Sequence, residues 1–509
     1  MSQAVSVALK GASKIKGLRW YICALLFFVT FINYVDRVSL GAMAPLLKKE
    51  VGWDDAQFGW INFSFQLSYA LMFPLAGRLL DKVGVRNGLA IGVVVWSIAA
   101  MGHSLATSAL GFAIARFILG LGEATNFPAC VKAVAEWFPK RQRSFATGIF
   151  NTGTNFGAML QGVMMWLAVV WHWQAAFILI GLLGFVWLVF WMRFYRSPEE
   201  HPNLSESEAT LIRSDQEPPA QALHIPWPSL LRYREAWAFF IGKMLTDPVW
   251  WFYLTWLPSY LQRERNVSLG SAASSLLVIY LFADFGSIFG GWLPGFLIRR
   301  GFTPSRARLS TMVLFALGLP ISALAVTAED LWTAVGLICV ATACHQAWSA
   351  NMFTVASDAF PKRAVASVVG FGGMCGAIGG LLMNLISGGM LQWLGTYAPL
   401  FVFAGVMHPI AWVAIRLLTG KTIKEVDVDS GLRTAFSPTL LGIGLVMTLL
   451  GVALAAVVTA NWGYILSVTK GSAATAAGGV AAAGLLALMG GALLYASREV
   501  RVRRPAAAA

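Results

Sequence analysis

Apolar residues occur along the chain in runs of about 20, which short polar or charged segments separate. A helix of about 20 mostly apolar residues spans the hydrocarbon core of a bilayer, so each run predicts one transmembrane helix. The pattern therefore predicts an all-α polytopic membrane protein with fourteen spans. The predicted spans lie at residues 20–42, 57–77, 88–106, 109–131, 145–168, 173–194, 236–261, 272–297, 308–326, 331–355, 365–391, 396–418, 438–458 and 475–496.

One long polar segment, residues 195–235, divides the first twelve predicted spans into two sets of six. The predicted domains are a six-helix bundle at 1–194, a cytoplasmic linker at 195–235 that contains a short amphipathic helix, a second six-helix bundle at 236–420, and an appended two-helix hairpin with a basic tail at 421–509. The hairpin is rich in small residues that pack helices together, and it contains no charge within its apolar runs.

Composition and charge support a membrane protein and exclude other classes. The chain has 509 residues, of which 57% are apolar and 12% are charged. Its net charge is +14, but most of the 38 Lys and Arg residues fall in alternate loops, as the positive-inside rule requires. This distribution predicts cytoplasmic termini and gives no reason to expect a nucleic-acid partner. The five cysteines show no metal-ligand spacing, and no phosphate-binding loop occurs, so we expect no metal, cofactor or ATP-driven pumping.

An internal repeat relates the two predicted bundles. The sequence FPKR at 138–141 recurs at 360–363, an offset of 222 residues. Two glycines follow each copy at the same offset, Gly148 and Gly157 in the first and Gly370 and Gly379 in the second. Two six-helix halves related by duplication resemble the plan of the major facilitator superfamily, in which the substrate site lies between the halves near the midplane.

Ionisable residues interrupt two of the apolar runs, with Asp36 and Arg37 in the first and Arg116 and Glu123 in the fourth. A charge at membrane depth costs roughly 2.5 to 3.5 kcal/mol on insertion scales, so such residues usually face a wet cavity. The helical rise places both arginines and Asp36 at one depth, with Glu123 nearer the midplane. We predict one shared cavity whose spare guanidinium donors match a carboxylate. The alternative is a structural ion pair between two helices.

Several motifs resemble known families. The loop GRLLDKVGVR resembles the signature loop of the major facilitator superfamily, which implies gating roles for Asp81, Arg78 and Arg86. The motif NYVDR, the pair Arg116 and Glu123, and Tyr69 resemble the anion:cation symporter family. The segments GKMLTDPVWWFYLTWLPSYL and CHQAWSANMFTVASDAFPKRAVASVVGFGGMCG are similar to bacterial hexuronate transporters of that family. The resemblance covers residues 20 to about 420 and stops before the last two predicted helices.

The resemblance implies roles for the embedded charges. Arg37 and Arg116 would bind the carboxylate of a sugar acid, and Asp36 and Glu123 would be the protonation sites. The other predicted substrate-binding residues are Tyr69, Gln66, Asn155, His345, Gln346, Ser349, Asn351, Asn384, Trp251 and Trp256.

Each of these residues has a structural alternative. An amide in a membrane helix is about as often a contact between helices as a ligand. His345 occupies the 222-offset position of Glu123, and a neutral hydrogen-bonded His is favoured over a proton carrier there. Lys243 and Asp247 lie one helical turn apart and are expected to pair with each other.

These observations predict a proton-coupled symporter in the bacterial cytoplasmic membrane, acting as a monomer, that imports a hexuronate such as galacturonate or glucuronate. Its partners would be a small organic anion, protons and membrane lipid. Within this class, the alternative substrate is another sugar acid, an aldonate or an aldarate. Outside it, the alternatives are a membrane receptor without transport and an intramembrane enzyme. Balanced charge in the cavity disfavours a drug exporter.

Overall fold

The computed structural model describes residues 14–426 except 54, 215–229, 232, 266–268, 395, 421 and 424. The predicted spans 438–458 and 475–496 and the basic tail lie outside the described residues. Within the described part of the chain, the secondary structure is helical apart from one isolated bridge between Ile15 and Leu204. The prediction of an all-α protein is therefore confirmed.

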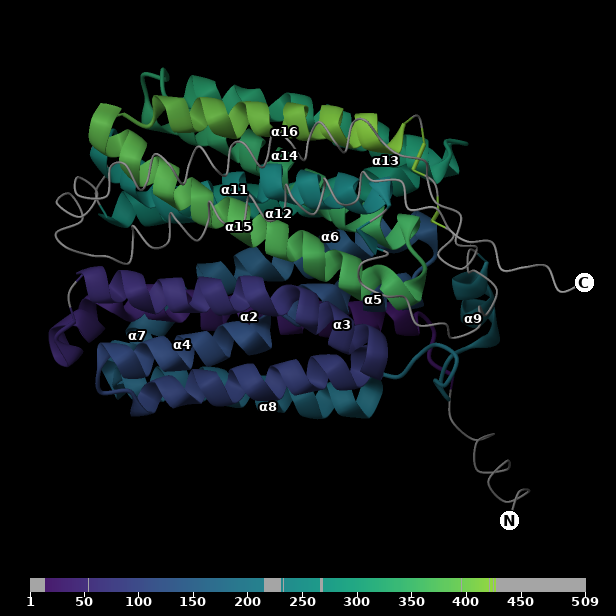
Figure 1. Cartoon of the computed structure of the whole chain (residues 1–509), viewed down its shortest axis with the longest axis horizontal. Helices are drawn as coiled ribbons and strands as arrows, with labels where there is room; N and C mark the ends of the chain where they lie inside the picture. Colours follow the sequence, from purple (N-terminus) through teal and green to yellow (C-terminus); the bar gives the residue numbers. More distant parts are fainter. Residues whose placement is uncertain are drawn as a thin grey trace, which may run out of the picture.

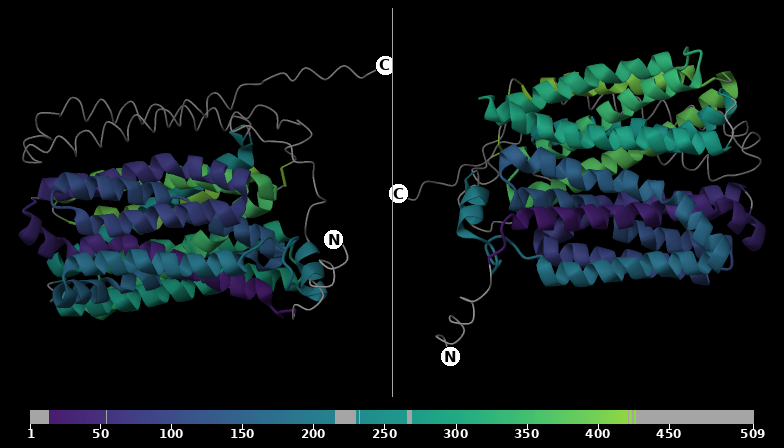
Figure 2. Two further views of the ribbon diagram at one scale, coloured as in Figure 1. Left: turned by 90° about the horizontal axis from the view of Figure 1, so that it is seen from below. Right: turned by 180° about the vertical axis from the view of Figure 1, so that it is seen from behind.

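The helices form two groups that lie one above the other in Figure 1 and again in the right-hand view of Figure 2. The first group contains α2 (Leu18–Val51), α3 (Asp55–Gly102), η2 (His103–Leu105), α4 (Ala109–Glu123), α5 (Asn126–Trp137), α6 (Lys140–Met159), α7 (Gln161–Trp171) and α8 (Trp173–Phe194). The second contains α11 (Arg234–Arg263), α12 (Leu269–Arg299), α13 (Pro304–Gly318), η3 (Leu319–Ala325), α14 (Leu331–Ala359), α15 (Lys362–Leu394) and α16 (Ala398–Thr419). The short helix α9 (Glu206–Arg213) lies between them in sequence.

The helix boundaries differ from the predicted spans at identifiable residues. In the described part of the chain, eight helical stretches are long and apolar enough to cross a membrane. The long helix α3 covers the predicted span 57–77 and most of the predicted span 88–106, and the segment between them contains Gly84, where φ is 79°. Gly favours this left-handed conformation because it has no Cβ atom. The predicted span 109–131 is divided into α4 and α5 near Ala124, since Pro128 has no N–H to donate to the Ala124 carbonyl oxygen.

The predicted amphipathic helix in the linker is present as α9. The Ser205 side chain caps its N-terminus by accepting a hydrogen bond from the Glu208 N–H at 3.4 Å. The Glu208 carboxylate then accepts from the N–H of Leu18 at 3.0 Å and from Arg19 Nη1 at 2.5 Å. A buried carboxylate thus lies against the first N–H groups of α2, where the helix dipole favours negative charge. We call this end of the molecule, at the right in Figure 1, the linker end.

Two polar clusters join the groups of helices at the linker end. Asp81 of α3 pairs with Lys132 of α5 at 2.8 Å, and it also accepts from the backbone N–H of Ser367 on α15 at 2.9 Å. Asp358 of α14 pairs with Arg143 of α6 at 3.2 Å and also with Arg308, whose guanidinium contacts Ser144 of α6. Each cluster therefore ties the first group to the second through a charged hydrogen bond.

The repeated glycines explain how the helices approach so closely at the same end. A Cβ atom added to Gly148 of α6 would lie 2.4 Å from the carbonyl oxygen of Ser287 on α12. A Cβ atom added to Gly370 of α15 would lie 2.4 Å from that of Phe73 on α3. Real Cβ contacts are not this short, so both crossings require glycine. The 222-residue repeat thus marks two equivalent contacts between the groups.

The second pair of repeated glycines serves equivalent contacts inside each group. Gly157 of α6 faces the carbonyl oxygen of Phe31 on α2, with 2.6 Å to an added Cβ atom. Gly379 of α15 faces that of Met244 on α11, with 2.5 Å. Small residues let membrane helices approach closely enough for backbone contact. Both halves therefore use the same glycine positions for the same crossings.

Candidate functional site

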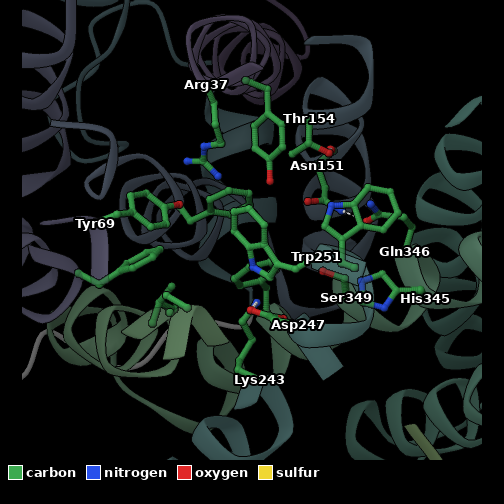
Figure 3. A pocket seen from close by; sticks show the side chains of 18 residues that line it. Arg37, Tyr69, Asn151, Thr154, Lys243, Asp247, Trp251, His345, Gln346 and Ser349 are labelled. Atoms are coloured by element: carbon green, nitrogen blue, oxygen red, sulfur yellow. Dashed lines mark hydrogen bonds and ion pairs between the residues drawn. The ribbon is translucent and has the colours of Figure 1, made fainter. Parts of the chain in front are cut away.

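A cavity lies between the two groups of helices (Figure 3). Aromatic rings supply much of its wall, and charged and amide groups project between them. The lining residues are Tyr34, Arg37, Tyr69, Phe73, Phe127, Asn151 and Thr154 from the first group, and Lys243, Asp247, Trp250, Trp251, His345, Gln346, Ser349, Phe353, Val369, Gly373 and Ala377 from the second.

Arg37 of α2 is the charged group that the first half presents to this cavity. Its Nη2 and Nε atoms donate to one carboxylate oxygen of Glu123 at 2.8 and 3.0 Å, and Nη2 also donates to Asn33 at 3.2 Å. These hydrogen bonds use Nε and Nη2, so Nη1 takes no part in the contacts with Glu123 and Asn33. The guanidinium is therefore held in place, with Nη1 as a candidate donor for an anion.

Aromatic rings orient the same guanidinium. Its carbon lies 4.7 Å from the ring centre of Tyr34 and 4.5 Å from that of Tyr69. Contacts at this distance stabilise a cation through the ring faces. Tyr34 lies three residues before Arg37 on one helix face, and sequence reasoning missed it although the spacing was available.

The four embedded charges divide into a layer at the cavity and a layer behind it. Arg116 does not line the cavity in this conformation, and its Nη1 donates to the backbone carbonyl oxygen of Arg37 at 3.1 Å. Asp36 is buried and also lies off the cavity wall. Successive residues on a helix project about 100° apart, so Asp36 and Arg37 cannot share one direction. Glu123 is fully buried behind Arg37.

The second half presents an ion pair on one helix. Lys243 Nζ lies 2.7 Å from Asp247 Oδ2 on α11, as the spacing of one turn predicts. The ammonium also lies 4.3 Å from the ring centre of Phe353. In Figure 3 both side chains enter the cavity on the side opposite Arg37.

Two histidines form a buried pair beside these groups. His345 lines the cavity, and its Nδ1 atom lies 3.0 Å from Nε2 of His408 on α16. Its ring stacks on Trp250 with 5.4 Å between centres and 6° between planes. A hydrogen bond between two ring nitrogens requires one of them to be unprotonated. This arrangement fits the favoured prediction of a neutral, hydrogen-bonded His345.

Amide groups close the cavity where the two halves meet. Asn151 of α6 donates to the Gln346 side chain on α14 at 2.7 Å and to Ser287 at 3.3 Å. Sequence reasoning named Gln346 but not Asn151, and it selected Asn155 one turn further along. Asn155 instead donates to Asp284 of α12 at 2.6 Å, away from the cavity wall. Asp284 was also missed.

Three of the other predicted residues lie outside the cavity wall in this conformation. Asn351 donates to the backbone carbonyl oxygens of Gly290 and Ala347 at 2.8 and 2.9 Å, the structural alternative noted for amides. Gln66 and Trp256 do not line the cavity, and the side chain of Asn384 lies outside the described residues.

Of the predicted gating residues, Asp81 lies in a cluster between the two groups, as described above. Arg86 donates to the backbone carbonyl oxygen of Met192 at 2.6 Å, at the end of α8. Arg78 lies three residues before Asp81 on α3. In the described part of the chain, no group of three or more His, Cys, Asp or Glu side chains could hold a metal ion.

Comparisons with known proteins agree with this architecture. The chain is 34% identical over 424 residues to the hexuronate transporter of Escherichia coli (strain K12), covering 82% of this chain and 98% of that protein. It is 35% identical over 285 residues to the galacturonate transporter of Dickeya chrysanthemi, covering 55% of this chain and 83% of that protein. The resemblance to bacterial hexuronate transporters is confirmed.

The fold comparison and the family comparison lead to one conclusion. The structure of the proton:xylose symporter XylE bound to 6-bromo-6-deoxy-D-glucose matches with a TM-score of 0.64 and 13% identity, covering 81% of this chain and 98% of that one. At this identity the match shows the fold alone. A family model described as Major Facilitator Superfamily matches residues 26–384. The chain therefore belongs to the Major Facilitator Superfamily, and it is a multi-pass membrane transporter rather than an enzyme.

Proposed function

We propose that this transporter is a proton-coupled symporter that imports a hexuronate such as galacturonate or glucuronate. The observation that carries the proposal is the guanidinium of Arg37, which enters a cavity rich in aromatic side chains and whose Nη1 lies outside the pairing with Glu123. A guanidinium matches a carboxylate with two parallel hydrogen bonds, and the tryptophans provide flat faces for a pyranose ring. The names of the two relatives support the same substrate class.

The pairing of Arg37 with Glu123 supports proton coupling. A uronate carboxylate at Arg37 competes with Glu123 for the same cation, so its arrival favours protonation of that fully buried acid. Reciprocity then requires lower pH to tighten substrate binding. Arg116 and Asp36, in the layer behind, would position Arg37 and supply a second protonation site.

We further propose that the two groups of helices, residues 1–194 and 236–420, move as bodies around the cavity, with 195–235 as the linker. If the linker end is cytoplasmic, as the distribution of Lys and Arg indicates, the clusters around Asp81 and Asp358 close the cytoplasmic side. The structure would then correspond to a state that receives substrate from outside the cell. Transport inward would require both clusters to open.

The test is uptake of labelled galacturonate into proteoliposomes, with the pH gradient and the membrane potential imposed separately. Accumulation that follows the pH gradient supports symport, and accumulation indifferent to it would contradict proton coupling. Each net positive charge moved adds about 2.3 kcal/mol per 100 mV, so a response to inside-negative potential indicates more than one proton per uronate. Binding without uptake would indicate a receptor instead.

A second candidate substrate, an aldarate, has one observation in its favour. Lys243 provides a second cation on the opposite side of the cavity from Arg37, although Asp247 already pairs with it, and a diacid carries a carboxylate at each end. An aldonate, with one carboxylate, fits the same cavity by the argument used for a uronate. Competition by each acid class against labelled galacturonate separates these candidates.

A further inference from the structure

The cavity presents different chemistry to the two ends of a bound sugar acid. On one side, Arg37 is paired with Glu123, which lies behind it and off the cavity wall. On the other side, Lys243 is paired with Asp247, and both partners line the cavity. The exposed fraction of the Asp247 side chain is 22%, against 8% for Lys243, so the carboxylate is the more accessible partner.

The position of the Asp247 carboxylate is fixed by packing. A Cβ atom added to Gly376 of α15 would lie 2.0 Å from Asp247 Oδ2, so the carboxylate rests directly on a helix surface that only glycine allows. Lys243 is fixed as well, because Phe353 lies against its ammonium. The pair therefore forms a rigid, neutral unit with one acceptor end and one donor end.

A neutral donor and acceptor pair is suited to hydroxyl groups. A carboxylate accepts a strong hydrogen bond from one hydroxyl, and an ammonium donates one to its neighbour. A second carboxylate at the same place binds unfavourably, because Asp247 repels it and Lys243 is already paired with Asp247. Specificity of this kind depends on the repulsive group as much as on the attractive one.

We infer that the Lys243 and Asp247 pair selects sugar monoacids over sugar diacids. The pair would contact the end of the substrate that is remote from Arg37. Asp247 accepts from a hydroxyl of the monoacid and excludes the second carboxylate of an aldarate. This inference rests on the proposed function, because it assumes that Arg37 holds the first carboxylate.

The experiment measures counterflow of labelled galacturonate by the full chain in proteoliposomes, with unlabelled galacturonate or galactarate as competitor. The measured quantity is the half-inhibitory concentration of galactarate divided by that of galacturonate. In the wild type we expect galactarate to compete at least about tenfold more weakly, because a like charge at the distal end opposes it. Asp247→Asn keeps the side-chain size and frees the ammonium, so the ratio should fall by at least about tenfold.

Two further variants test the same inference by removing the ammonium of Lys243. Lys243→Gln leaves the carboxylate without its counter-charge, so the ratio should rise above the wild-type value. The double variant K243Q/D247N removes the ammonium that the second carboxylate would use. Galactarate should therefore compete less well in the double variant than in D247N alone. Asp330→Asn is the matched control, since Asp330 caps α14 far from the cavity and Asn is an equally good cap.

The outcomes separate this inference from the proposed function. Galacturonate counterflow with the same ratio in the wild type, D247N and K243Q would overturn the inference and leave the proposed function standing. Absence of galacturonate counterflow in the wild type, with the protein folded, would overturn both. Because D247N and K243Q are expected to move the ratio in opposite directions, loss of either variant to misfolding still leaves one decisive measurement.

Discussion

In the first half of the transporter, the charged pair at the cavity joins two helices, Arg37 of α2 and Glu123 of α4, whereas in the second half Lys243 and Asp247 lie on one helix. A pair between helices depends on the packing of both, but a pair one turn apart needs only the helix itself. The first arrangement is suited to a partner that changes during transport, and the second to recognition that stays constant.

The internal repeat shows the same contrast. Its glycines make equivalent crossings in both halves, yet the position of Glu123 in the first half is occupied by His345 in the second. His345 has a hydrogen-bonded ring partner, and Glu123 has a guanidinium. Duplication therefore preserved the backbone contacts while the side chains at the cavity diverged in charge.

The largest expected effect comes from removing the guanidinium of the first half. Arg37→Ala should weaken galacturonate binding by about 2 to 5 kcal/mol, because the anion and Glu123 both lose their partner. Arg37→Lys should recover little of this loss, since lysine lacks the two-pronged geometry. Calorimetric titration of the purified protein measures the effect, with Arg306→Ala, an exposed residue at the linker end, as control. Wild-type affinity in Arg37→Lys would contradict bidentate binding.

The repeat-related pair Glu123 and His345 should differ in energy coupling. Glu123→Gln should reduce accumulation driven by a pH gradient by about 5- to 150-fold, the usual range of coupling between two sites. Counterflow exchange should fall much less, because it needs no net proton movement. His345→Gln should preserve the response to the pH gradient. Equal loss of the gradient response in both variants would remove the proposed distinction between the halves.

Substitution of the repeated glycines should have the same effect in both halves, which tests whether the two crossings are equivalent. Gly148→Ala and Gly370→Ala each place a methyl group against a backbone oxygen across the interface, and overpacking of this kind costs about 1 to 3 kcal/mol. Both should shift the population toward a state with the linker end open. Labelling of a single cysteine at Ala366, in a background without the native cysteines, reports the opening. Gly336→Ala, where an added Cβ meets nothing within 4 Å, should label like the parent.

The smallest expected effects concern the segments attached at the linker end. Glu208→Gln removes a buried charge from the start of α2 and should lower stability by about 0.3 to 2 kcal/mol. Glu425→Gln removes a more exposed pair with Lys140 and should cost less than about 1 kcal/mol. Thermal unfolding in detergent measures both apparent midpoints. A larger loss in the Glu425 variant would show that the exposed pair is the stronger attachment.

The fold was predictable because the patterns that determine it can be recognised along the sequence itself. Apolar runs located the spans, and the repeated glycines revealed the duplication. The exceptions arose where one residue changes the backbone, as when Pro128 ends the hydrogen bonding that would join α4 to α5. The appended hairpin lies outside the described residues and stays a prediction.

The depth of the site residues in the membrane was predictable from the sequence, but the direction in which each side chain points was not. Helical rise placed Arg37 and Arg116 near one level, and the local pair Lys243 and Asp247 followed from spacing alone. The rotation of each helix depends on packing against its neighbours, which one sequence does not reveal. Asn155 was therefore chosen where Asn151 faces the cavity. The contact of His345 with His408, 63 residues away, has no local signal at all.

The glycine crossings at the linker end also bear on how fast the transporter can cycle. At Gly148 and Gly370 one backbone lies directly against another, and no side chain from the glycine interlocks with the opposite helix. Such a smooth surface can part and rejoin without rotamer changes or gaps to refill. If the linker end opens as proposed, the activation barrier would reside mainly in the charged hydrogen bonds of Asp81 and Asp358. The turnover number would then be adjustable at two carboxylates that lie outside the cavity wall.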